Sequence, residues 1–127
     1  MRVLVDTSVL IDHLRGDPRA VALFASRSAA GDEIWSVTPV RTEVLAGMRR
    51  AEEARTRALL TALRWQDITV DLADRAGALA ARYLRSHQGV DTVDYLIAAG
   101  VEHLGALLLT QNVRHFPMFK DLQRAYR

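Results

Sequence analysis

Residues 2–12 read RVLVDTSVLID, and this stretch decides the fold class. The apolar run Val3-Leu4-Val5 is typical of a buried strand, and Asp6-Thr7-Ser8 is a cluster that can cap a helix. Apolar residues from Val9 to Leu14 then recur at helical spacing. The stretch therefore predicts a strand that leads directly into a helix, with Asp6 at the junction.

The rest of the chain repeats this alternation of short apolar runs and helical segments. Further strands are expected at 33–37, 65–70 and 106–110, and further helices at 18–31, 38–50, 52–63, 71–87 and 91–105. The run 106–110 is almost wholly apolar, which is typical of a strand buried on both faces of a parallel sheet. Strands separated by helices predict an α/β fold, a three-layer α/β/α sandwich around a central parallel sheet.

Composition bounds the class of protein. The 127 residues fit a single domain, 1–127, and 50% hydrophobic with 25% charged residues excludes a disordered chain. The absence of cysteine excludes disulfides and thiolate metal sites. No apolar run approaches the roughly 20 residues that cross a bilayer, and a charge at Asp6 comes too early for a signal peptide. We therefore expect a cytoplasmic protein without a membrane partner.

The charge balance says less about partners. The 17 Lys and Arg residues nearly match the 15 Asp and Glu residues, which is weak evidence for nucleic-acid binding. Lys120 is the only lysine, and arginine suits bidentate phosphate contacts, but an arginine-biased coding sequence gives the same composition. Composition alone does not identify the function.

Polar residues gather where a parallel sheet binds ligands, beyond the carboxyl ends of its strands. Asp6 and Asn112 follow two predicted strands, and Glu43 borders the apolar face of its helix. Asp91 and Asp94, three residues apart, share one side of a helix start. Each of these residues also has a purely structural explanation. Asp6 and Asp91 could be helix caps, and Glu43 could pair with a surface arginine. Asp94 could be an acid favoured in the first turn of a helix, and Asn112 could be a turn residue after a strand. Asp12 and Asp17 read as surface or capping acids.

If these acids converge, they repel one another unless a cation lies between them. Oxygen ligands without cysteine or clustered histidine favour Mg²⁺, with Mn²⁺ as the other possibility, over Zn²⁺. Such a site suits phosphodiester hydrolysis by a metal-activated water.

Four segments in order resemble the PIN-domain ribonucleases, specifically the VapC-type toxins. The segments are 5–12, VDTSVLID; 42–44, TEV; 94–99, DYLIAA; and 110–116, TQNVRHF. The resemblance covers essentially the whole chain. It implies an Mg²⁺- or Mn²⁺-dependent endoribonuclease that cuts RNA and is neutralised by a cognate antitoxin. It also implies a homodimer or a heteromeric complex with that antitoxin.

Carried over by position, Asp6, Glu43 and Asp94 match the acidic triad of the family. Asn112 stands where many members have a fourth Asp, and Asp91 could supply that carboxylate instead. The match makes Asp6, Asp94 and Glu43 metal ligands, and the hydroxyls of Thr7 and Thr110 flank the site. Asp91 has no fixed counterpart in the motif and is a further candidate ligand. Arg114 could contact the phosphate that is cut or a neighbouring one, whereas His115 reads as a structural residue.

Two departures and two rival functions remain. Asn112 weakens a second metal site, and the chain ends so soon after Phe119 that a fifth strand must be short or missing. A catalytically weak or inactive PIN-fold module that binds RNA or protein is the alternative function. A phosphoacceptor receiver domain is disfavoured, because Lys120 lies in the tail and not at a strand end. The Leu59-Leu60-Leu63 side of its helix is a candidate partner surface.

Overall fold

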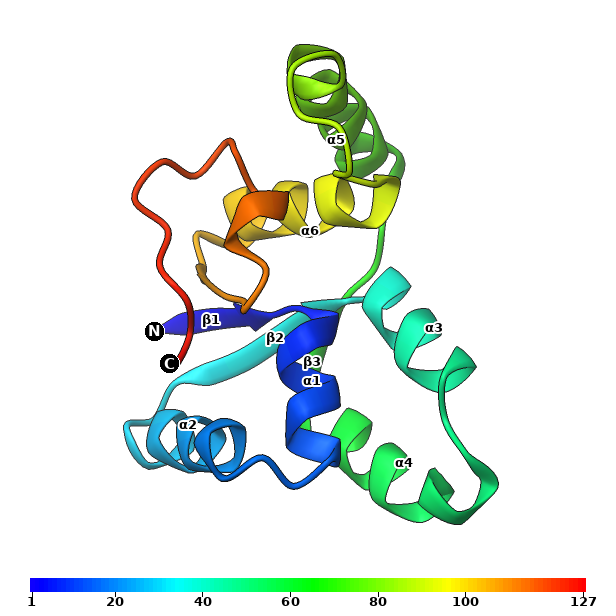
Figure 1. The fold of residues 1–127 in the computed structure, drawn as a ribbon, viewed down its shortest axis with the longest axis vertical. Coiled ribbons are helices and arrows are strands. Elements are labelled where there is room, and N and C mark those ends of the chain that lie inside the picture. Colours follow the sequence, from blue (N-terminus) through cyan, green and yellow to red (C-terminus); the bar gives the residue numbers. More distant parts are fainter.

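The computed structural model describes residues 1–127 and contains one sheet of four strands (Figure 1). The strands are β1 (Arg2–Val5), β2 (Glu33–Val37), β3 (Arg64–Gln66) and β4 (Leu107–Leu109), in the order β3-β2-β1-β4. All three neighbouring pairs are parallel. The predicted parallel α/β fold is therefore confirmed.

Six helices flank the sheet in the expected three-layer arrangement. In Figure 1, α5 and α6 lie on one side of the strands, and α2 and α4 lie on the other. The helices are α1 (Thr7–Leu14), α2 (Pro18–Ala29), α3 (Thr38–Ala46), α4 (Glu53–Ala62), α5 (Val70–Tyr83) and α6 (Thr92–Leu104), with short 3-10 turns η1 (Arg50–Glu52) and η2 (Val113–His115). None of them has the length and apolar character needed to cross a membrane.

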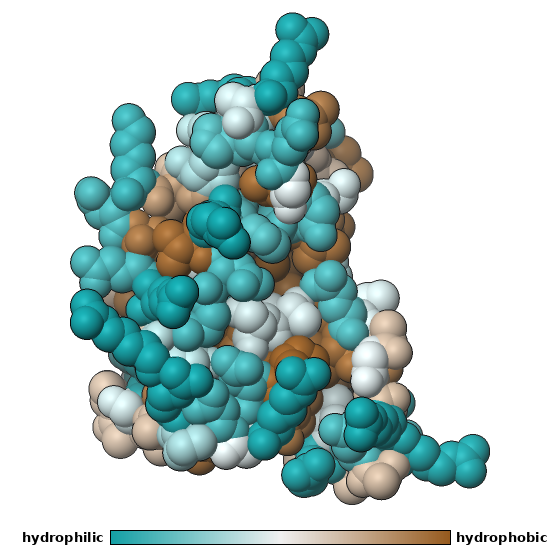
Figure 2. All heavy atoms as spheres, viewed as in Figure 1, coloured by the Kyte–Doolittle hydropathy of each residue, from teal (hydrophilic) through white to brown (hydrophobic).

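The central strand β1 explains why the core forms where it does. Val3, Leu4 and Val5 are at most 1% exposed, because β1 is covered by helices on both faces and by β2 and β4 at its edges. On the outside, the face seen in Figure 2 is mostly hydrophilic, with apolar side chains showing between polar ones. The apolar runs of the sequence therefore mark the sheet and the helix faces that pack on it.

Side-chain caps set where several helices begin. In four helices a side chain accepts a hydrogen bond from a backbone N–H of the first turn. The capping residue is Asp6 for α1, Asp17 for α2, Thr69 for α5 and Asp91 for α6. At its other end α6 stops at Gly105, whose φ of +60° suits a residue without Cβ. Asp17 is thus the capping acid that the sequence predicted.

Several predicted boundaries are wrong. The strand expected at 65–70 spans only 64–66, because Thr69 accepts the N–H of Leu72 and begins α5 at Val70.

The partner surface expected on one side of α4 is also wrong, because Leu59, Leu60 and Leu63 are buried core residues. No fifth strand follows η2, as the short tail predicted. The tail nevertheless lies along the edge of the sheet, where the N–H of Ala125 donates to the carbonyl of Thr110 at 2.9 Å.

Candidate active site

Side chains from four parts of the chain line one pocket of about 390 Å³ at the carboxyl edge of the sheet. They come from the β1–α1 junction, from α3, from the start of α6 and from the segment after β4. The lining residues are Asp6, Thr7, Ser8, Ile11, Asp12, Arg15, Glu43, Asp91, Asp94, Ile97, Asn112 and His115. The structure therefore brings together the four acids and the asparagine that the sequence singled out.

Strand register places Asp6 at the centre of this edge. Val5 of β1 pairs with Leu109 of β4, so the next residues, Asp6 and Thr110, lie side by side. The Thr110 hydroxyl donates to Asp6 Oδ2, and the Ser8 hydroxyl donates to Oδ1 at 2.6 Å. The N–H of Val9 also donates to Oδ1, at 3.2 Å. Asp6 is thus both the cap of α1 and a fixed wall of the pocket.

Burial dominates the electrostatics of Asp6. Its residue is only 4% exposed, and this burial raises the pKa of the carboxyl above its ordinary value. The hydrogen bonds from Ser8, Thr110 and the backbone oppose that rise but do not overcome it. A nearby cation would stabilise the ionised form of this carboxyl.

Asp91 and Asp94 form a reciprocal capping box at the start of α6. The N–H of Asp91 donates to Asp94 Oδ2 at 3.1 Å, and the N–H of Asp94 donates to Asp91 Oδ1 at 3.0 Å. Burial, and secondarily the charge of Asp91, raise the pKa of Asp94 to about 6. Asp91 is therefore the helix cap that the sequence allowed, and its carboxylate also lies on the pocket wall.

His115 of η2 contacts the same acid. Its Nδ1 lies 3.2 Å from Asp94 Oδ2, so a protonated ring would form an ion pair. The attraction of His115 lowers the pKa of Asp94 but is a smaller effect than burial. This contact agrees with a structural role for His115.

Glu43 and Thr7 join the two helices on the open side of the pocket. The Thr7 hydroxyl at the start of α1 donates to Glu43 Oε1 of α3 at 2.6 Å. Thr7 and Thr110 thus act in the same way, since each hydroxyl donates to an acid of the pocket. Both threonines flank the acids as expected.

The segment after β4 divides the remaining predicted residues between two hollows. Asn112 lines the acidic pocket, and its N–H donates to the Thr110 hydroxyl at 2.9 Å. Arg114 does not line that pocket and lines an adjoining hollow instead. Any phosphate that Arg114 contacts would therefore lie beside the acids and not among them.

Sequence reasoning missed three polar lining residues in α1 and directly after it. Ser8 donates to Asp6, Arg15 lines the pocket, and Asp12, predicted as a surface acid, lines it too and accepts from the Tyr126 hydroxyl. Their spacing of four and three residues places Ser8, Asp12 and Arg15 on one face of α1. That periodicity, counted from Ser8, could have identified Asp12 and Arg15.

The oxygen ligands of the pocket suit a hard divalent cation, but the acids lie farther apart than direct coordination by all of them requires. No group of three or more His, Asp or Glu side chains lies close enough together to hold a metal ion directly. Mg²⁺ usually keeps several waters and takes only one or two carboxylates, so a largely hydrated ion fits these oxygen ligands. The raised pKa values of Asp6 and Asp94 point the same way, because a cation relieves their burial.

Comparison with known proteins identifies the family. The PIN domain model matches residues 3–122. The chain belongs to the PIN domain family. It is 50% identical to ribonuclease VapC19 of Mycobacterium tuberculosis over 97% of this chain and 98% of that protein. It is 42% identical to ribonuclease VapC10 of the same species, over 95% and 90%.

A solved structure supports the same assignment. A toxin–antitoxin complex from Klebsiella pneumoniae contains a chain with a TM-score of 0.80 and 25% identity, covering 98% of both chains. The pocket of this PIN domain thus lies in a fold shared over its whole length with a chain of known structure.

Proposed function

We propose that this protein is a divalent-metal-dependent endoribonuclease that acts as the toxin of a toxin–antitoxin pair. The observation that carries the proposal is the convergence of Asp6, Glu43, Asp91 and Asp94 on one pocket. Two similar proteins are named ribonucleases, and a third similar chain belongs to a toxin–antitoxin complex, which supports both parts of the proposal. All three are matched over at least 90% of their length.

Mg²⁺ is the proposed metal, with Mn²⁺ as the second choice, because all the ligands are hard oxygens. Asp6 and Asp94 are the proposed main ligands, directly or through water, and Glu43, Asp91 and Asn112 complete the shell. A bound divalent cation would make a water more acidic and would stabilise negative charge on the phosphate.

The residues of the chain have distinct proposed roles. Asp6 is held by three donors, so it presents its carboxylate in a fixed orientation. Glu43 lies at the exposed side, where it can orient the attacking water and accept its proton. His115 keeps Asp94 oriented through their 3.2 Å contact.

We also propose that the protein acts in the cytoplasm. Its proposed substrate is RNA, and its proposed protein partner is an antitoxin. The similar solved structure is a toxin–antitoxin complex, which supports a complex of the same kind here. The toxin itself is proposed to form a homodimer, or a heteromeric complex with the antitoxin.

One observation favours a second function, a catalytically weak PIN-fold binding module. Asn112 supplies an amide where a fourth acid would strengthen a second metal site. The two functions differ in outcome, because an inactive module leaves RNA intact with any divalent cation.

The test is to map cleavage ends in total RNA incubated with the protein and Mg²⁺, with and without EDTA. We expect new 5′ ends that disappear with EDTA and with Asp6→Asn. Asp74→Asn, which removes an exposed carboxylate of α5, is the matched control and should cleave like the wild type. Intact RNA with both Mg²⁺ and Mn²⁺ would favour the binding module.

A further inference from the structure

A second hollow opens beside the acidic pocket. It encloses about 280 Å³ and is lined by residues 111–115 and by Arg124. Asn112 and His115 line both hollows, so the two share one wall. A ligand strand lying across the acids can therefore continue directly into the second hollow.

The second hollow is basic and its arginines are unpaired. Arg114 and Arg124 both line it, and no carboxylate does. Six other arginines of the chain form salt bridges and eight form none. Arg114 and Arg124 form neither a salt bridge nor a side-chain hydrogen bond, so their donors are free for a ligand. Two guanidinium groups with free donors are suited to bind a phosphate group.

The tail of the chain positions Arg124 for this purpose. Ala125 donates to the carbonyl of Thr110, and the Gln111 side-chain amide pairs with both backbone groups of Tyr126, at 2.8 and 3.1 Å. Arg124 is thereby brought beside Arg114, ten residues earlier in the chain. Both arginines stand on backbone that is anchored to the edge of the sheet.

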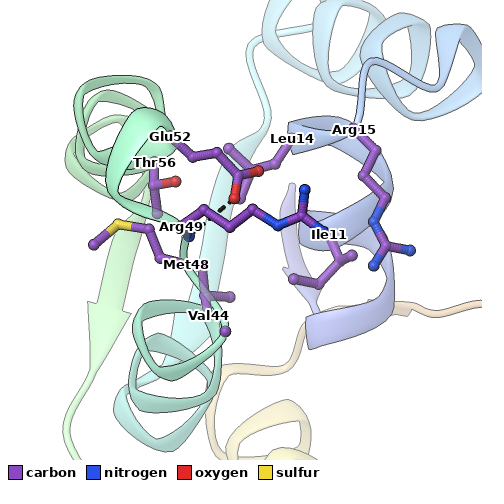
Figure 3. A pocket seen from close by; sticks show the side chains of 9 residues that line it. Ile11, Leu14, Arg15, Val44, Met48, Arg49, Glu52 and Thr56 are labelled. Atoms are coloured by element: carbon purple, nitrogen blue, oxygen red, sulfur yellow. Dashed lines mark hydrogen bonds between the residues drawn. The ribbon is translucent and has the colours of Figure 1, made fainter.

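Arginines also border the acidic pocket where α1 ends. Arg15 and Ile11 line both that pocket and a groove of about 210 Å³ between α1 and the α3–α4 connection. Figure 3 shows Arg49 reaching across this groove toward Ile11. The acidic pocket is therefore bordered by arginines on the η2 side and on the α1 side, which suits an extended polyanion with one phosphate at the acids.

We propose that Arg114 and Arg124 form a subsite for a backbone phosphate of the RNA strand, next to the phosphate that is cut. This inference rests on the proposed function. A phosphate contact holds the strand in place without reading its sequence. RNA is a better occupant than a protein segment, because Val113 is the only apolar residue of the hollow and offers no pocket for an apolar anchor.

The experiment compares Arg114→Gln, Arg124→Gln and the double variant with the wild type. Arg85→Gln is the control, because Arg85 is an exposed, unpaired arginine beyond the end of α5. KM and kcat are measured on a short fluorescent single-stranded RNA with Mg²⁺. The Kd of the same RNA is measured by anisotropy in EDTA at several NaCl concentrations.

The double variant should raise KM about tenfold with kcat unchanged, because the lost contacts are made equally in ground and transition states. Its slope of log K against log salt should become shallower by about 0.7 for each lost arginine. Arg85→Gln should match the wild type in every measurement.

If the wild type cleaves RNA but the double variant has an unchanged KM and an unchanged salt slope, the proposed phosphate subsite is wrong. The proposed nuclease function would stand in that case. A loss of kcat alone would also overturn the subsite, since the arginines would then act on the reacting group. So would a double variant that binds RNA normally but binds the antitoxin weakly. Failure of the wild type to cleave would instead refute the nuclease, and the salt slopes in EDTA would still test the subsite.

Discussion

At the scale of single residues, the pocket is organised by hydroxyl donors. Thr7 donates to Glu43, while Ser8 and Thr110 donate to the two oxygens of Asp6. Such donors partly offset the cost of burying carboxylates and fix the direction in which their remaining lone pairs point. The small hydroxyl residues of the site are therefore positioning residues for the acids.

Thr110→Val should remove one of these donors with little change of shape. We expect a loss of about 1–2 kcal/mol in the free energy of unfolding, because a buried carboxylate oxygen loses its partner. Cleavage should fall with it, whereas Thr110→Ser should retain both stability and cleavage. Urea unfolding and initial cleavage rates check this. Equal stability of the valine and serine variants would show that the hydrogen bond to Asp6 contributes nothing.

The raised pKa of Asp94 predicts a pH dependence. The folded protein holds a proton on this group up to about pH 6, whereas the unfolded chain releases it near 3.8. Stability from this group is therefore fully present below about pH 3.8, is lost as pH rises through about 6, and is constant above that. In EDTA, the Tm difference between wild type and Asp94→Asn should move in favour of the variant across this range. A difference that is independent of pH would contradict the raised pKa.

At the scale of elements, the site depends on where strands end and helices begin. The sequence predicted the strand–helix alternation and the caps Asp17 and Asp91, because these follow from local patterns. The predicted burial of β4 is correct for Leu108 and Leu109 but not for Leu107, which is 39% exposed. It did not predict the end of β3, since the Thr69 cap begins α5 at Val70 and competes with the apolar run that suggested a longer strand. Asp12 was misjudged because its partner, Tyr126, lies 114 residues away.

Close packing of α6 on β2 gives a prediction for two glycines. A Cβ at Gly100 would lie 2.6 Å from Val37 Cγ1, whereas a Cβ at Gly77 of α5 would meet nothing within 4 Å. Gly100→Ala should lower the free energy of unfolding by about 1 kcal/mol, because the overpacking exceeds the gain in helix propensity. Gly77→Ala should raise it by about 0.5–1 kcal/mol. Thermal and urea unfolding measure both, and a stabilised Gly100→Ala would contradict the close approach.

At the scale of the whole molecule, the C-terminal tail packs against α1 and α2 beside the site. Arg19 of α2 lies over the Tyr126 ring and donates to the Arg127 carbonyl at 2.6 Å, and Gln111 binds the backbone of Tyr126. The N–H of Gln111 in turn donates to Ser8, which donates to Asp6. These long-range contacts connect the tail to the central acid, and no local sequence pattern could predict them.

Removal of residues 125–127 should therefore affect both stability and cleavage. We expect a loss of about 2 kcal/mol in the free energy of unfolding, from several backbone hydrogen bonds, and slower RNA cleavage because Gln111 is released. Tyr126→Phe keeps the backbone pairing and loses only the bond to Asp12, so it should be milder. Urea unfolding and cleavage rates test this. If the truncated protein matched the wild type in both, the tail would have no role in the site.

The central claim is that the gathered acids bind a divalent cation, and calorimetric titration with Mn²⁺ at pH 7 tests it most directly. The wild type should bind Mn²⁺, Asp6→Asn and Asp94→Asn should bind at least about tenfold more weakly, and Asp74→Asn should bind like the wild type. Folded wild-type protein that takes up no Mn²⁺, or that binds it no better than Asp6→Asn and Asp94→Asn do, would contradict the account.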